Sequence, residues 1–79
     1  MKVDVKFDDG IGLIDIPSLS NWFTNEKIIP NIGEHLFVND NCEDQAKVAG
    51  SYEWKVVGKY FDPHMNEVTI RFNDVNNII

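Results

Sequence analysis

The chain has 79 residues, 43% of them hydrophobic, with two tryptophans, two tyrosines and five phenylalanines. This length and composition exclude a disordered chain and predict one small folded domain over residues 1–79. The formal net charge of −6 disfavours nucleic acids and anionic membranes as partners, because an acidic surface repels their phosphate groups.

The first 17 residues predict a β-hairpin. Segment 2–8 alternates apolar and charged residues, which is the period of a half-buried strand. Asp9 and Gly10 form a common turn dipeptide, and a second strand follows it. Pro17 ends that strand, because proline has no N–H to donate to a strand ladder.

Residues 18–33 predict a long connection that contains at most one helical turn. Ser18 or Ser20 can cap such a turn through its hydroxyl group. Trp22 and Phe23 are adjacent, so their side chains point in different directions in any regular element.

Residues 33–40 contain a predicted third strand of about five residues. The polar residues 40–50 predict a loop that is long for a compact domain. Loops of this kind are either functional or mobile, so we treat 40–50, together with the connection at 18–29, as a candidate interaction segment.

Residues 52–72 predict the longest hairpin of the chain. Apolar and polar residues alternate on both of its strands, and Asp62 and Asn66 supply the turn between them. Gly58, in the middle of the first strand, predicts a bend or a bulge. The mostly polar residues 74–79 predict a frayed tail.

These segments amount to about five strands with short turns and little helix. An all-β domain of this size removes its exposed strand edges most simply by closing into a barrel. The sequence therefore predicts an all-β fold, a small barrel of about five antiparallel strands with at most one short helical turn.

The stretches IIPNIGEHLFV and YEWKVVGKYFDPHMNEVTIRF share a layout in which Pro-x-x-Gly-Glu leads into a strand and a long aromatic hairpin follows. Pro30, Gly33 and Glu34 stand at the named positions. This layout, over residues 28–73, resembles that of small SH3-like β-barrel proteins of bacteria, phages and mobile elements. The resemblance implies an SH3-like barrel. It implies no catalytic residues, since most such proteins have no assigned activity.

The chain lacks the patterns of metal sites and of enzymes. Its one cysteine, Cys42, excludes a disulfide within the chain, and with His35 and His64 it does not match the spacing of zinc ligands. The acidic residues at 40–44 do not match a calcium-binding loop, and no nucleophile or phosphate-loop motif is present. We expect a protein with no enzymatic activity, no metal and no cofactor.

The start of the chain has charged residues at almost every second position, which differs from the apolar core of a signal peptide. No run approaches the roughly 20 apolar residues that span a bilayer. We therefore expect a cytoplasmic protein that does not enter a membrane, and the single thiol fits that compartment.

The leading functional hypothesis is a non-enzymatic protein-interaction module or an accessory subunit. In SH3-like barrels, which the chain resembles, exposed aromatic side chains bind extended or proline-rich peptides. The candidate partner-binding residues are Trp22, Phe23, Tyr52 and Phe61. The alternative for Trp22 and Phe23 is that they cap an open end of the barrel. We assign Trp54 to the core. The partner is an unknown protein, and free strand edges are also compatible with a homodimer.

The alternative hypothesis is a small barrel that binds nucleic acid. Lys55, Lys59 and Arg71 fall on the polar sides of paired strands, so they are expected to share one outward face of the long hairpin. Glu53 and Glu67 fall on the same face and reduce its positive charge.

Overall fold

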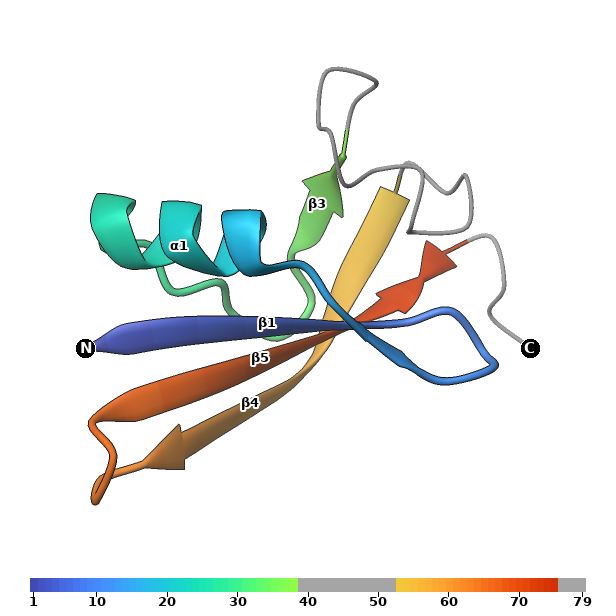
Figure 1. Cartoon of the computed structure of the whole chain (residues 1–79). Helices are drawn as coiled ribbons and strands as arrows, with labels where there is room; N and C mark the ends of the chain where they lie inside the picture. The colour runs from blue at the N-terminus through green and yellow to red at the C-terminus, as the bar shows by residue number, and fades with distance from the viewer. Residues whose placement is uncertain (39–52, 76–79) are drawn as a thin grey trace.

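The structure is a computed structural model that describes residues 1–38 and 53–75 (Figure 1). Its elements, in chain order, are β1 (Lys2–Asp8), β2 (Leu13–Asp15), α1 (Pro17–Glu26), β3 (His35–Phe37), β4 (Glu53–Asp62) and β5 (Glu67–Asp74). The predicted loop at 40–50, Tyr52 and most of the predicted tail lie outside the described residues. Within the described part, no helix is both long and apolar enough to cross a membrane.

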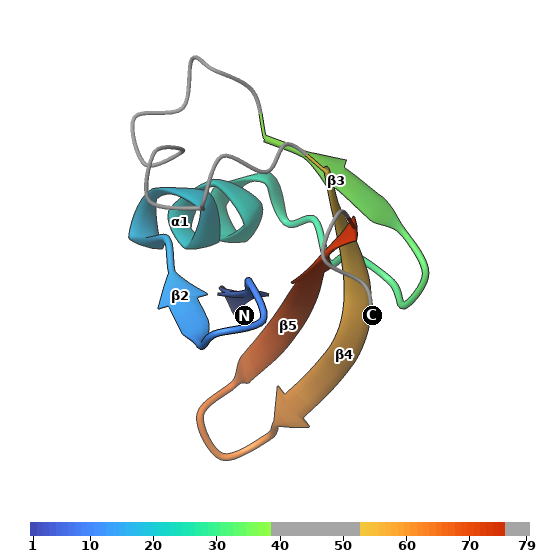
Figure 2. The same ribbon diagram turned by 90° about the vertical axis from the view of Figure 1, so that its right-hand side faces the viewer.

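The strands form one sheet of five, in the order β2-β1-β5-β4-β3. β1 and β5 run parallel, whereas the other neighbouring pairs are antiparallel. The sheet is open, with β2 and β3 at its edges, and α1 lies over one face (Figure 2). The predominance of strands is confirmed, but the closed barrel of antiparallel strands is wrong. Because α1 covers the apolar face, the sheet buries that face without closing on itself.

Both predicted hairpins are confirmed. In the first, β1 pairs with β2, and Gly10 has the positive φ of 93° that its tight turn requires. In the second, β4 pairs with β5, and the Asp62 carboxylate accepts hydrogen bonds from the backbone N–H groups of His64 (3.0 Å) and Met65 (3.2 Å). Asn66 follows with φ 51°, a left-handed conformation that asparagine tolerates well.

The ten-residue helix α1 replaces the predicted connection with at most one turn. Pro17 starts it, in the first-turn position where a missing N–H costs nothing. The side chains at Ile16, Leu19, Ser20 and Phe23 repeat with the spacing of one helical face and pack toward the sheet. The prediction that Ser18 or Ser20 caps a turn is wrong, because the helix has no side-chain cap.

The C-terminal end of α1 is closed by backbone hydrogen bonds. Lys27 takes the left-handed conformation (φ 57°, ψ 38°), and its N–H bonds to the carbonyl oxygen of Thr24 at 3.3 Å. The N–H of Ile28 bonds to the carbonyl oxygen of Phe23 at 3.1 Å. This pair of bonds is the Schellman motif, which satisfies the last carbonyl groups of a helix and turns the chain away.

The core lies between α1 and the inner face of the sheet. Phe7 packs edge-on against Trp54, with ring centroids 5.1 Å apart, and stacks on Phe72 at 5.0 Å. Phe23 joins the cluster from the helix, 6.5 Å from Phe72. The assignment of Trp54 to the core is confirmed. The buried apolar residues are Val3, Val5, Phe7, Ile16, Phe23, Val38, Trp54, Val56, Val68, Ile70 and Phe72.

α1 also covers part of the edge of β1. β2 pairs only with the stretch Lys6–Asp8, so the earlier N–H groups on that side of β1 need other acceptors. The Ser20 hydroxyl accepts the N–H of Val5 at 3.0 Å, and the Thr24 hydroxyl accepts the N–H of Val3 at 2.9 Å. Two hydroxyl groups one helical turn apart thus accept the N–H groups of the β1 edge that the short β2 does not pair with.

Candidate functional site

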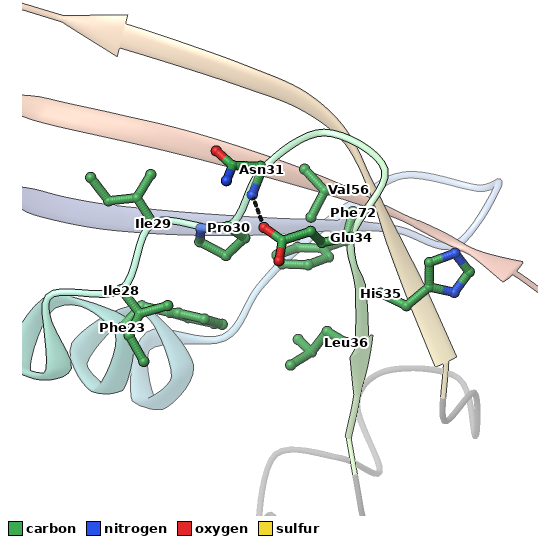
Figure 3. Close-up of a pocket in the computed structure, with 10 residues that line it drawn as sticks. All are labelled: Phe23, Ile28, Ile29, Pro30, Asn31, Glu34, His35, Leu36, Val56 and Phe72. Carbon is green, nitrogen blue, oxygen red and sulfur yellow. Dashed lines mark hydrogen bonds between the residues drawn. The ribbon is translucent and has the colours of Figure 1, made fainter.

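An open groove lies between the end of α1, the segment 28–34 and strands β3 and β4 (Figure 3). Its volume is about 340 Å³. Its deepest side chains are apolar and belong to the core: Phe23, Val56 and Phe72. The groove is therefore shaped to take an apolar group, with polar side chains available only around it. The remaining lining residues are Ile28, Ile29, Pro30, Asn31, Glu34, His35 and Leu36.

A tight turn at residues 31–34 builds one wall of the groove. The Glu34 N–H bonds to the Asn31 carbonyl oxygen at 3.0 Å, with Gly33 between them at φ 94°. The N–H of Gly33 bonds to the Val56 carbonyl oxygen at 3.0 Å, and the N–H of Val56 bonds to the Glu34 carbonyl oxygen at 2.8 Å. This pattern is a glycine-type β-bulge. It explains why a glycine followed by Glu34 leads into β3.

Polar contacts hold the rim of the groove in place. The Glu34 carboxylate accepts the backbone N–H of Asn31 at 2.5 Å (Figure 3). The Asn31 side-chain oxygen accepts a hydrogen bond from Lys59 Nζ at 2.8 Å. His35 Nδ1 lies 2.5 Å from the Glu53 carboxylate across β3 and β4. The rim side chains are thus engaged with one another rather than gathered around a common point.

The described residues do not assemble a metal site. No group of three or more histidine, cysteine or acidic side chains among them is placed to hold a metal ion. The groove offers an apolar floor and a hydrogen-bonding rim, which are the features of a binding site.

The structure separates the predicted partner-binding aromatics. Phe23 is only 3% exposed and belongs to the core, where it also forms part of the floor of the groove. It faces inward because it lies on the apolar side of a helix that the sequence pattern did not reveal. Trp22 is 47% exposed on α1 and packs edge-on against Phe23, with ring centroids 5.0 Å apart. Phe61 is 58% exposed on β4, and Tyr52 lies outside the described residues.

A β-bulge in β4 changes which side chains share a face. The register of β4 against β5 shifts between Val56 and Gly58, as the mid-strand glycine predicted. Beyond the bulge, Lys59 lies opposite Ile70 and Phe61 lies opposite Val68, so both point to the inner face of the sheet. The alternation in the sequence predicted correctly that Lys59 and Phe61 share one face of β4. It also predicted that Lys55 lies on that same face, which is wrong because the bulge stands between them.

The predicted face of three cations is therefore wrong. Lys55 lies opposite Asn73 on the outer face, and Arg71 is on that same face, whereas Lys59 is on the inner face. Arg71 is also engaged, because its Nη2 donates a hydrogen bond to the Asp8 carboxylate. This separation removes the single surface on which the nucleic-acid hypothesis depended.

Paired charges occupy the outer face of β1. The Gly10 N–H, and then Arg71, hold the pKa of the Asp8 carboxyl group below its ordinary value. Lys6 contacts Asp4 at 3.3 Å and forms a second ion pair with Asp15. The hydrogen bond to Asp15 is the largest cause of a raised pKa at Lys6. These charges balance one another, so the outer face of β1 has no strong field of one sign.

Several exposed apolar side chains were not singled out by the sequence pattern. Phe37 on β3 is 70% exposed, and Ile32 in the turn is 66% exposed. Tyr60 lies over Gly58, where an added Cβ would come within 2.6 Å of the tyrosine ring. The sequence could have indicated exposed apolar side chains through its adjacent apolar pairs at 28–29 and 36–37. One member of such a pair must face away from the core.

Comparison with known proteins finds no family model, no curated protein and no solved structure that matches the chain. The function proposed below is therefore inferred from the geometry of the described residues.

Proposed function

We propose that this chain is a non-enzymatic protein-interaction module or an accessory subunit of a larger assembly, and that it acts in the cytoplasm. The observation that carries the proposal is the open apolar groove of Figure 3 together with the exposed apolar side chains on the segments that form it. Those side chains are Trp22 on α1 and Ile28 and Ile32 on the following segment. The exposed Phe37 on β3 lies opposite Glu53 and points to the outer face of the sheet, away from the groove. An apolar groove with exposed apolar side chains on the segments that form it is typical of an interaction site.

Trp22 is the strongest candidate for a hot spot on this surface. It sits on the helix beside Phe23, which forms part of the groove floor. Tryptophan contributes a disproportionate share of interface energy because it buries a large rigid surface. Phe61 lies on a different element and forms a separate candidate contact.

The proposal is tested by removing apolar surface beside the groove and, as a control, at the opposite edge of the sheet. The test variant is Trp22→Ser with Ile28→Ser, and the matched control is Ile11→Ser with Leu13→Ser, where both residues are exposed. Affinity capture from host lysate is followed by binding to the purified partner. The wild type and the control should bind the same protein, and the test variant should bind it at least tenfold more weakly while keeping its melting temperature.

Two results contradict the proposal. In one, the folded test variant binds the partner as tightly as the wild type does. In the other, neither the wild type nor the control captures a protein that binds again after purification.

A further inference from the structure

The edge strand β3 lies beside the groove of Figure 3. β3 is the last strand of the sheet, and in the described part of the chain it pairs with β4 on one side and with no strand on the other. The sheet curls, so that β3 stands across from α1 (Figure 2). Leu36 of β3 points into the groove, which Phe23 of α1 lines from the other side (Figure 3). A strand edge and an apolar groove therefore meet at His35–Phe37.

The hydrogen bonds of β3 show which of its backbone groups face the free edge. The N–H of Val56 bonds to the carbonyl oxygen of Glu34 at 2.8 Å, so this position of the ladder is a bonded one. Bonded and unbonded positions alternate along antiparallel strands, so Leu36, two residues further on, is the next residue that bonds to β4. The N–H and carbonyl groups of His35 and Phe37 consequently point away from β4, toward the free edge.

The other edges of the sheet carry protection that β3 lacks. Natural sheets discourage pairing at an edge with charged side chains, prolines or a covering segment. Along β1, the N–H groups that β2 does not reach are accepted by Ser20 and Thr24 of α1. β2 contains the exposed Asp15, and Pro17 follows two residues later. β3 contains no acidic residue, lysine or proline, and its Phe37 is 70% exposed, so this edge is suited to accept a further strand.

We infer that the free edge of β3 binds an extended segment of the partner protein as a sixth strand, and that this segment places an apolar side chain in the groove. Strand addition takes its affinity from main-chain hydrogen bonds and its specificity from pockets beside the edge. Successive side chains of the added strand alternate, so one lies beside Leu36 at the groove and the next lies beside Phe37 on the outer face. The bound segment therefore has apolar residues at two adjacent positions. The inference rests on the proposed function, because it states how the partner binds.

Three observations favour a separate partner over a second copy of this chain. Leu36, the inward side chain of β3, already packs against its own core, so a second β3 has no side chain to offer to the groove. Two paired β3 edges bring together only three residues from each copy, whereas stable interfaces use about 20–30 residues from each side. The net charge of −6 also opposes self-association.

The test uses short random peptides displayed on phage, which are selected on the full chain and then synthesised. Amide hydrogen exchange of the chain, with and without saturating peptide, locates the bound strand. The N–H groups of His35 and Phe37 should exchange at least tenfold more slowly in the complex, because each gains an acceptor. The N–H of Leu36 already bonds to β4, so it is the internal control.

N-methylation of the peptide removes its backbone donors one at a time and leaves the protein unaltered. Methyl groups on the amides that face β3 should weaken binding at least tenfold, because each one removes a main-chain hydrogen bond and adds bulk at the edge. Methyl groups at the intervening positions should change the affinity by no more than about twofold, because those amides point away from β3.

A proline at the free edge gives the matching change in the protein. Phe37→Pro removes an N–H that takes no part in pairing with β4, and it should weaken peptide binding at least tenfold. Phe37→Ala keeps that N–H and should weaken binding less. The control at the opposite edge is Leu13→Pro, in β2, which should leave the affinity unchanged.

The inference is overturned if no peptide is enriched, if exchange at His35 and Phe37 is the same with and without peptide, or if N-methylation has one effect at every position. Protection of these two amides by self-association, without peptide, would assign the edge to a second copy and also overturn it. The proposed function fails separately. It stands if the wild type captures a partner that Trp22→Ser with Ile28→Ser loses and that Phe37→Pro binds normally.

Discussion

Two non-glycine residues in the described part of the chain, Lys27 and Asn66, have a positive φ, and lysine tolerates this conformation less well than asparagine does. The Schellman motif at the end of α1 places this lysine at φ 57°, where most helices of this kind carry glycine. Because the Lys27 side chain is exposed, this strain can be removed without opening a cavity in the core.

Replacing Lys27 by glycine should stabilise the protein. We expect Lys27→Gly to raise the free energy of unfolding by about 0.5–1 kcal/mol, because the left-handed conformation costs glycine nothing. The matched control is Glu26→Gly, at the last residue of the helix, where the backbone is helical and glycine should lower it by up to about 1 kcal/mol. Urea unfolding measures both changes. A loss of stability in Lys27→Gly would contradict the left-handed conformation at this position.

Asp8 should make stability depend on pH. Its pKa is below the ordinary value of 3.8, because the Gly10 N–H and Arg71 favour the ionised carboxylate. A lowered pKa in the folded state means that the stabilisation is complete above the unfolded pKa and is lost as the pH falls through the folded one. The stability difference between wild type and Asp8→Asn should therefore shrink below about pH 5.

Urea unfolding of both proteins across the acidic range measures this difference. The control is Asp62→Asn, in the turn of the second hairpin, where the carboxylate bonds to backbone N–H groups and has no cationic partner among the described residues. A difference between wild type and Asp8→Asn that stays constant from neutral to acidic pH would rule out the contribution of the ionised Asp8.

Among the secondary-structure elements, α1 has two roles that its sequence shows only indirectly. Its apolar side covers the inner face of the sheet, and its hydroxyl groups accept N–H groups from the edge of β1. Ser20 is 6% exposed, so the hydrogen bond that it accepts from Val5 is removed from water. A buried N–H without an acceptor destabilises the folded state by the free energy needed to remove that group from water.

Ser20→Ala should lower the free energy of unfolding by about 1–3 kcal/mol, because it leaves the Val5 N–H without an acceptor. Asn25→Ala is the matched control on the exposed side of α1, and it should be neutral or slightly stabilising. Thermal unfolding measures the stability, and hydrogen exchange at Val5 reports the lost bond directly. Unchanged exchange at Val5 in Ser20→Ala would show that the serine is not its acceptor.

At the scale of the whole molecule, one cluster of aromatic side chains packs the helix against the sheet. Phe23 from α1, Phe72 from β5 and Phe7 from β1 make consecutive ring contacts. A domain of this size has a net stability of only a few kcal/mol, so the loss of one of these rings is a large fraction of the total. Adjacent residues on α1 should therefore respond very differently to truncation.

Phe23→Ala should cost about 3–5 kcal/mol and leave much of the chain unfolded at room temperature. Its neighbour provides the control, because Trp22→Ser removes a half-exposed ring and should leave a folded protein. Near-ultraviolet circular dichroism and thermal melting distinguish the two variants. Equal stability of Phe23→Ala and Trp22→Ser would contradict the placement of Phe23 in the core.

The two hairpins could be predicted from local sequence alone. Alternation with period two defines each strand, and Asp9-Gly10 and Asp62 to Asn66 favour turns through their own side chains and backbone preferences. These are short-range effects, so they are readable without a fold. The core position of Trp54 and the bulge at Gly58 were predicted on the same local grounds and are confirmed.

The remaining features depend on contacts between distant parts of the chain. α1 contains serine, asparagine, threonine and aromatic residues with modest helix propensity, so its stability comes from packing against the sheet rather than from its composition. The parallel pairing of β1 with β5 joins segments from opposite ends of the chain. The face on which Lys59 and Phe61 lie depends on one extra residue in β4, because a shift by one position moves every later side chain to the other side of the sheet.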